Sequence, residues 1–160
     1  MKRNLFLLLF SIFVSILPIN AQTFGPHFFS GLDSLPGVET VYLDSTTLQQ
    51  IISANPPKDA AEYNEILCGV EKIEILTCAD TARQSLLMAF TTNLVKALGM
   101  ETLVACNEDN ETARIFIRPS AAAKNGHSGL LVEAIEGKAY TLVYIHGDIS
   151  EKMLNYISFD

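Results

Sequence analysis

The stretch Leu130–His146, LLVEAIEGKAYTLVYIH, holds the clearest structural pattern in the chain. Two alternating runs, Leu130–Glu136 and Ala139–His146, flank Gly137-Lys138, a glycine-first connection that is typical of a tight β-hairpin turn. Pairing through this turn sets Glu136 opposite Ala139 and divides the side chains between two faces. One face receives Leu130, Val132, Ala134, Thr141, Val143 and Ile145, and the other receives Leu131, Glu133, Ile135, Tyr140, Leu142, Tyr144 and His146.

Four further segments alternate in the manner of strands. They are Val38–Leu43, Val70–Thr77, Glu101–Cys106 and Thr112–Arg118. The last two surround a polar turn at 107–110, which predicts a second antiparallel hairpin.

Helical spacing of apolar residues appears between and after these strands. The first expected helix follows a cap at Asp44 or Ser45 and stops at Asn55-Pro56-Pro57, and a short second helix covers Ala60–Leu67. The longest helix follows caps at Thr77 and Asp80 and ends at Gly99. A closing helix follows a capping-box pair, Asp148 and Glu151. Together the elements predict an α+β domain with a single largely antiparallel or mixed sheet of about five to six strands and helices packed on one face.

The first 21 residues have the pattern of a secretory signal peptide. Lys2 and Arg3 precede an apolar run over 5–17, and Ala21 offers a small residue for cleavage. The run is shorter than the ~20 residues that a membrane-spanning helix needs, and no later stretch approaches that length. We therefore expect an exported protein, periplasmic or secreted, with 22–37 as a flexible or loosely docked lead-in and 38–160 as one domain. No cysteine stands at the position directly after the cleavage site, so no lipid anchor is expected.

The charge balance restricts the class of partner. The chain carries 11 basic and 18 acidic residues, and removal of Lys2 and Arg3 makes the balance more acidic still. Nucleic acids and anionic lipids bind clusters of Lys and Arg, so neither is an expected partner.

Three cysteines leave the disulfide question open. Cys68 and Cys78 flank the strand Val70–Thr77, which would hold them roughly 30 Å apart, so they cannot pair with each other. A bridge would have to join Cys106 to one of them. The alternative is that all three are small apolar residues with free thiols.

Searches for reactive groups find no strong motif. The sequence has no glycine-rich phosphate loop and no closely spaced His or Cys pair of the zinc type, so no cofactor or metal is expected. Gly126-His127-Ser128-Gly129 lacks the spacing of a nucleophile elbow and fits a turn better. His146-Gly147-Asp148 places an imidazole near a carboxylate, although a strand end followed by a helix cap explains it more simply. His27 lies in the weakly patterned lead-in and gives no basis for a metal site.

Three passages carry a resemblance to a known family. They are Glu71–Thr77 before the long helix, Arg114–Arg118, and Leu142–Ile149 before the closing helix. Over Val38–Ile157 the chain resembles domain-of-unknown-function family 4252, small exported proteins of Gram-negative bacteria. The resemblance implies an α+β domain with helices packed on a sheet and implies no established activity.

One predicted sheet face gives the best functional hypothesis. If helices cover the side that bears Val132 and Val143, the other side is open to solvent, as is common in antiparallel sheets. That side presents Tyr42, Lys72, Glu74, Arg114, Phe116, Arg118, Glu133, Tyr140, Tyr144 and His146. Tyr, Arg and Phe on a rigid sheet are typical of a protein-binding surface. We expect Arg114, Phe116, Arg118, Glu133, Tyr140, Tyr144 and His146 to bind an envelope protein or peptide, without enzymatic activity.

Two other functions stay open at this point. One is a small periplasmic hydrolase in which His146 works with Glu133 or Asp148. The other is a carrier of small apolar ligands with a void lined by Phe90, Leu94 and Ile115.

Overall fold

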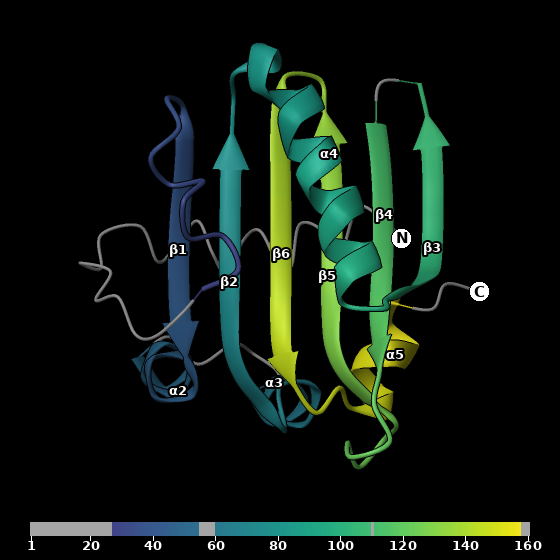
Figure 1. Cartoon of the computed structure of the whole chain (residues 1–160). Coiled ribbons are helices and arrows are strands. Elements are labelled where there is room, and N and C mark those ends of the chain that lie inside the picture. Colours follow the sequence, from purple (N-terminus) through teal and green to yellow (C-terminus); the bar gives the residue numbers. More distant parts are fainter. Residues whose placement is uncertain (1–26, 55–59, 110, 158–160) are drawn as a thin grey trace.

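The computed structural model describes residues 27–54, 60–109 and 111–157. The predicted signal peptide and the first five residues of the lead-in lie outside these ranges. Within them the chain forms six strands and four helices around one sheet (Figure 1).

The sheet is antiparallel throughout, in the order β1-β2-β6-β5-β4-β3. The strands are β1 (Val38–Asp44), β2 (Val70–Cys78), β3 (Glu101–Glu108), β4 (Glu111–Pro119), β5 (His127–Glu136) and β6 (Ala139–Gly147). The predicted α+β class with a single antiparallel sheet is confirmed.

The β5–β6 hairpin forms the centre of the sheet in the predicted register. Glu136 pairs with Ala139 across the turn, and Val132 pairs with Val143. Gly137 has φ +58°, a left-handed conformation that glycine adopts without strain. The turn chemistry therefore fixed which side chains share a face.

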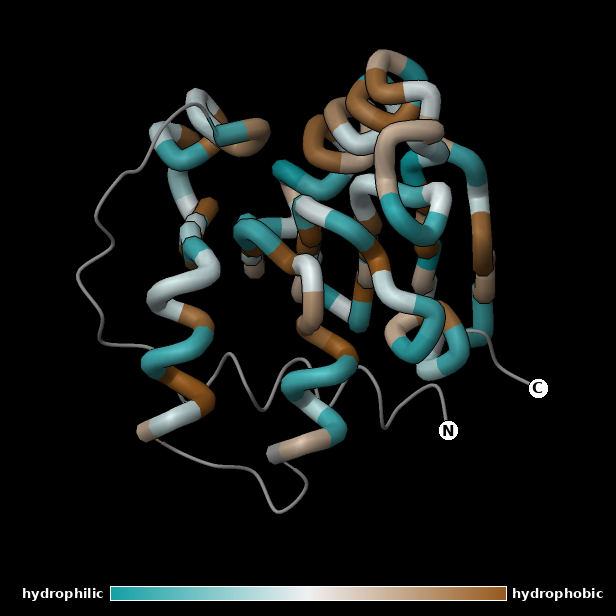
Figure 2. Tube along the Cα trace, turned by 90° about the horizontal axis from the view of Figure 1, so that it is seen from below, coloured by the Kyte–Doolittle hydropathy of each residue, from teal (hydrophilic) through white to brown (hydrophobic). Residues whose placement is uncertain are grey.

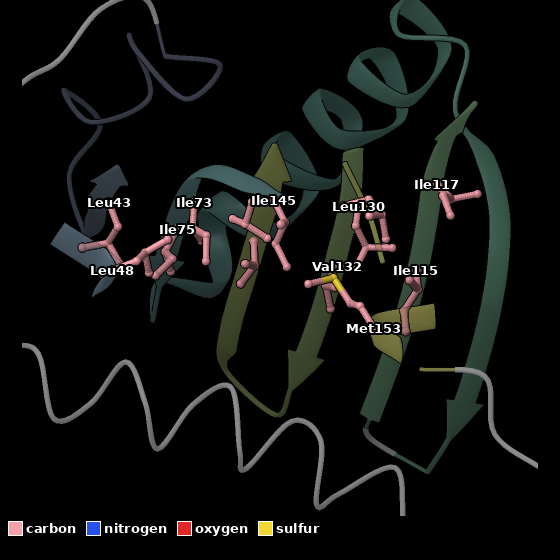
Figure 3. Packing of buried hydrophobic residues seen from close by; sticks show 13 residues of the cluster. Leu43, Leu48, Ile73, Ile75, Ile115, Ile117, Leu130, Val132, Ile145 and Met153 are labelled. Carbon is pink, nitrogen blue, oxygen red and sulfur yellow. The ribbon is translucent and has the colours of Figure 1, made fainter. Parts of the chain in front are cut away.

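One face of the sheet packs against α2 (Ser45–Ala54), α3 (Ala60–Ile66) and α5 (Glu151–Ile157). Asp44 caps α2, because its Oδ1 accepts a hydrogen bond of 2.7 Å from the Thr47 amide. We call the apolar interior on this side the first core (Figure 3). Its buried members are Leu43, Leu48, Val70, Ile73, Ile75, Ile115, Ile117, Leu130, Val132, Val143, Ile145, Ile149 and Met153.

The other face, which the sequence led us to expect open, is covered as well. It packs against α4 (Thr81–Ala97) and against residues 27–37, which we call the strap. Viewed from below, α4 and the strap lie on one side of the sheet and α2 and α3 on the other (Figure 2). The buried members of this second core are Phe29, Val38, Leu76, Cys78, Leu87, Met100, Phe116, Leu131, Tyr140, Leu142 and Tyr144.

Strand order explains why α4 covers this face. The helix joins β2 to β3, which stands four strands away at the far edge of the sheet, a distance of roughly 19 Å. A helix of 17 residues is about 25 Å long and can make this crossing diagonally. Figure 1 shows α4 running across the sheet in this way. Burial favours the arrangement, since each fully buried leucine side chain contributes about 1.5–3 kcal/mol.

The sheet also separates the cysteines. Cys106 lies on β3, roughly 19 Å across the sheet from β2. Cys78 is buried at the end of β2, and Cys68 is exposed just before β2. A disulfide needs Cα atoms within about 7 Å of each other. Strand order therefore excludes both bridges that the sequence left open for Cys106.

Candidate functional site

The seven residues expected to bind a partner all lie on the covered face. Glu133, Tyr140 and Tyr144 are fully buried, and Phe116 is nearly so. Arg114, Arg118 and His146 are partly exposed. Because α4 and the strap lie over this face, the seven residues do not form the open surface that we expected.

The first of two polar clusters on this face surrounds Glu133 on β5. Arg114 on β4 is its direct cross-strand neighbour and donates to Glu133 Oε2. The Tyr140 hydroxyl on β6 donates to Glu133 Oε1 at 2.9 Å. The Arg114 guanidinium also lies over the Phe116 ring, 5.5 Å from its centroid. Both oxygens of the buried carboxylate are therefore bonded by neighbouring strands.

Tyr140 extends this cluster to the long helix. Its hydroxyl lies 2.6 Å from Thr91 Oγ1 and 3.2 Å from the Leu87 carbonyl oxygen, both on α4. Burial, together with the charge of Glu133, raises the pKa of Tyr140 well above its usual range. The phenol stays protonated as a donor, so the cluster anchors α4 to the sheet.

The second cluster surrounds Glu74 on β2, whose carboxylate is also fully buried. His27 Nδ1 lies 2.9 Å from Oε1, and His146 Nε2 lies 3.1 Å from Oε2. The Phe28 amide donates to both oxygens, at 3.1 and 3.2 Å. An ionised carboxylate only accepts hydrogen bonds, so both imidazoles act as donors.

Opposing influences set the charge state of this cluster. Burial raises the pKa of Glu74, but the hydrogen bond and charge of His146, the Phe28 amide and the charge of Lys72 outweigh it, and the pKa lies below its usual value. The pKa of His146 is also lowered, because burial outweighs the favourable effect of Glu74. The combination favours an ionised Glu74 beside a neutral His146 at neutral pH.

Aromatic contacts surround the Glu74 cluster. The His27 ring stacks on Tyr42 of β1 with centroids 3.8 Å apart. The Phe28 ring lies nearly parallel to His146 at 5.0 Å and meets the edge of Tyr144 at 4.9 Å. Phe29 is fully buried in the second core. Three consecutive strap residues thus bind the sheet through hydrogen bonds and aromatic packing.

Sequence reasoning missed this role of the strap. Residues 27–37 have no strand or helix period, and His27 is separated from Glu74 by 47 positions. One signal was present: Glu74 alternates with Leu76 on a side of the sheet that also carries Leu131 and Leu142. An acid in such apolar surroundings needs a donor from elsewhere in the chain.

The hydrolase pairs predicted from the sequence do not meet. His146 binds Glu74, whereas Glu133 binds Arg114 and Tyr140. Asp148 Oδ1 accepts from the Asn125 amide at 3.2 Å. Asp148 also does not cap α5 as predicted, because Ser150 Oγ, closer to the first helical turn, accepts from the Met153 amide at 3.1 Å.

The three residues predicted to line a void for apolar ligands cannot line one cavity. Ile115 belongs to the first core, whereas Phe90 and Leu94 pack in the second. The sheet lies between them.

Neither a metal cluster nor a membrane helix is found in the part of the chain that the structure describes. No three His, Cys, Asp or Glu side chains there are placed to hold a metal ion together. No helix in the same ranges combines the length and the apolar character needed to cross a membrane.

The surface of α4 that faces away from the sheet is unusually poor in charge. We call it the α4 outer surface, and it comprises Ala82, Ser85, Leu86, Met88, Ala89, Thr92, Asn93 and Lys96. Leu86 is 47% exposed and Met88 is 37% exposed. The helix contains no acidic residue, although the whole chain has 18.

Comparison with known proteins identifies a family. The family model described as Domain of unknown function (DUF4252) matches residues 32–157, and neither a curated protein nor a solved structure matches the chain. The matched range includes every strand and helix described above and begins after His27 and Phe28. It confirms the resemblance inferred from the sequence. The chain therefore belongs to the DUF4252 family.

Proposed function

We propose that this protein is a non-enzymatic, exported envelope protein that binds another protein through the α4 outer surface. The observation that carries the proposal is the exposure of Leu86 and Met88 on a helix without acidic residues. The solvent side of a helix in a globular protein is normally charged or polar. Leu86 and Met88 are two positions apart, so they lie at opposite edges of the α4 outer surface, with small uncharged side chains between them. An extended exposed surface of low charge is typical of an interaction site.

The charges of α4 indicate the character of the partner. Arg83 stands near the start of the helix and Lys96 near its end. Methionine and leucine supply adaptable apolar contact, and flanking positive charges favour a partner surface with acidic groups around an apolar centre. We therefore propose an acidic, amphipathic protein segment as the binding partner.

The polar clusters support a binding role over a catalytic one. Glu74 and Glu133 are the buried acids that could serve in proton transfer, and both are fully engaged in hydrogen bonds within the fold. A general acid or base must reach the substrate. Here the strap covers Glu74, and α4 and its neighbours cover Glu133.

Site-specific crosslinking in intact cells tests the proposal. A photo-crosslinking amino acid at position 86 should give one discrete adduct with an envelope protein, and Met88→Glu in the same chain should reduce that adduct at least fivefold. The matched control is the same crosslinker at position 103 on β3, where Leu103 is 38% exposed. Equal adducts from positions 86 and 103, or none from position 86, would contradict a binding site on α4.

A further inference from the structure

The surface beneath the strap has the properties of a peptide-binding site. It is formed by Tyr42 of β1, Glu74 of β2, and Tyr144 and His146 of β6, and we call it the strap groove. We propose that the strap groove is a peptide-recognition site that the strap fills within one chain and that the strap of a second copy of this chain fills in a dimer. This inference is independent of the α4 outer surface.

Glu74 accepts hydrogen bonds from both the backbone and a side chain of the strap. Of the three groups that donate to the carboxylate, His27 and the Phe28 amide belong to the strap, and only His146 belongs to the groove. A buried carboxylate that loses two of three donors is left poorly satisfied. Any segment that replaces the strap must bring an equivalent backbone amide and an equivalent side-chain donor.

The aromatic contacts add sequence specificity. His27 stacks on Tyr42, and Phe28 packs against both His146 and Tyr144, whose rings also contact each other. Phe29 enters the second core near Phe90, with ring centroids 6.2 Å apart. Three consecutive residues therefore occupy three adjacent subsites. The sequence that satisfies all three, together with Glu74, is His-Phe-Phe, and every copy of the chain carries it.

Residues 30–37 of the strap connect His27–Phe29 to β1, and this connection is suited to exchange between copies. Ser30, Asp33 and Ser34 are exposed, and the backbone hydrogen bonds between residues 27 and 38 close local turns. Gly31 and Gly37 have φ +92° and +80°, so the connection turns at two residues that tolerate a change of backbone conformation. Exchange of an identical segment preserves the same contacts in the dimer, which makes it a low-cost route to association.

A complementation experiment with full-length, exported protein tests the exchange. The Glu74→Gln chain keeps an intact strap and has a defective groove, whereas the Phe28→Ala chain has a defective strap and an intact groove. A mixture of the two can form one native strap–groove pair between chains. We expect affinity-tagged Glu74→Gln protein to retain untagged Phe28→Ala protein at least tenfold more than it retains the Glu74→Gln/Phe28→Ala double variant, which is the matched control.

A peptide experiment tests the groove itself. A fluorescent peptide of residues 25–32, GPHFFSGL, should bind Phe28→Ala protein at least tenfold more tightly than wild type, whose own strap competes for the site. The same peptide with alanine at the positions of His27 and Phe28 should not bind. If Phe28→Ala protein does not fold, as judged by circular dichroism, His27→Ala removes a donor while both phenylalanines remain.

The outcomes separate the two parts of the proposal. Mixed dimers together with peptide binding support it. Peptide binding without mixed dimers overturns the second copy as the occupant, and absence of peptide binding by folded variants overturns the groove as a recognition site. Neither result depends on the crosslinks expected from α4.

Discussion

Glu74 and Glu133 are both fully buried acids on the same face of one sheet, yet their partners come from different parts of the chain. The partners of Glu133 stand on the two strands beside its own, and Tyr140 links it to α4. Two of the three donors to Glu74 come from the strap, which precedes β1 and has largely exposed turns. The comparison indicates that similar chemistry serves two purposes: Glu133 links neighbouring strands, whereas Glu74 binds the strap to the sheet, an attachment that we propose can be exchanged.

The largest effect should follow removal of the Glu133 carboxylate. Glu133→Ala leaves the Arg114 charge and the Tyr140 hydroxyl without their buried acceptor, and breaking a buried pair from one side costs about 3–5 kcal/mol. Urea unfolding should show a loss of free energy of unfolding in this range. Glu136→Ala, an exposed site at the end of the same strand, is the control and should stay within about 0.5 kcal/mol of wild type. Equal stability of the two variants would contradict the assigned role of Glu133.

Glu74→Gln should have a smaller and more local effect. The amide retains the size of the side chain but loses the charge, and poorer hydrogen bonding of buried donors costs about 1–3 kcal/mol. Hydrogen exchange followed by mass spectrometry should show faster exchange in 27–37 and little change in β5 and β6. Uniformly faster exchange across the sheet would show that the strap does not open on its own.

Acid and base should affect the two clusters differently. The pKa of His146 in the folded protein is lowered from 6.5, mainly by burial, and that of Glu74 is lowered from 4.5. In both cases the unfolded chain binds the proton more readily, so stability present at neutral pH falls below pH 6.5 and falls further below pH 4.5. The groups that face Glu74 are His27, His146, Lys72, Tyr42 and Tyr144.

The raised pKa of Tyr140 makes stability depend on pH in the opposite direction. Above pH 10 the unfolded chain releases the phenolic proton while the folded chain retains it, so stability decreases with rising pH. Unfolding free energies measured from pH 4 to pH 11 should therefore decline toward both ends. Tyr140→Phe should reduce the alkaline decline, and His146→Gln the first part of the acidic decline; unchanged profiles would count against these assignments.

The smallest effect should come from an ion pair at the surface. Lys152 on α5 binds Glu65 on α3. Surface ion pairs are weak because water screens them and long side chains lose rotational freedom. Lys152→Ala should leave the urea midpoint unchanged within the error of the measurement. A clear loss of stability in Lys152→Ala would contradict the conclusion that Glu74 and Glu133 contribute more than surface ion pairs because they are buried.

Local patterns accounted for the strands and for the register between β5 and β6. Alternation together with Gly137 fixed the β5–β6 pairing, so the members of each face, such as Val132 and Val143 against Leu131 and Leu142, were predicted correctly. The face covered by α4 was not predictable in the same way. Both faces of β5 and β6 are apolar, and the path of α4 depends on β3 standing at the far edge of the sheet, which is a long-range property.

The Glu74 site shows a second limit of sequence reasoning. Tyr144 and His146 were placed on the correct face, but their contacts depend on His27 and Phe28, which lie in a segment without periodicity. Glu133 and Arg114 were likewise predicted to share a face, as cross-strand neighbours do. Because these residues are buried or partly buried, groups that we expected to bind a partner protein instead stabilise the fold.

Strand order also determines when the sheet can be completed. β6 is the last strand to be synthesised, and it stands between β2 and β5. Until it arrives, the β1–β2 pair and the β3–β4–β5 group have no strand to join them. Pairings between distant parts of a chain slow folding, so the complete sheet closes only after the last strand has been synthesised.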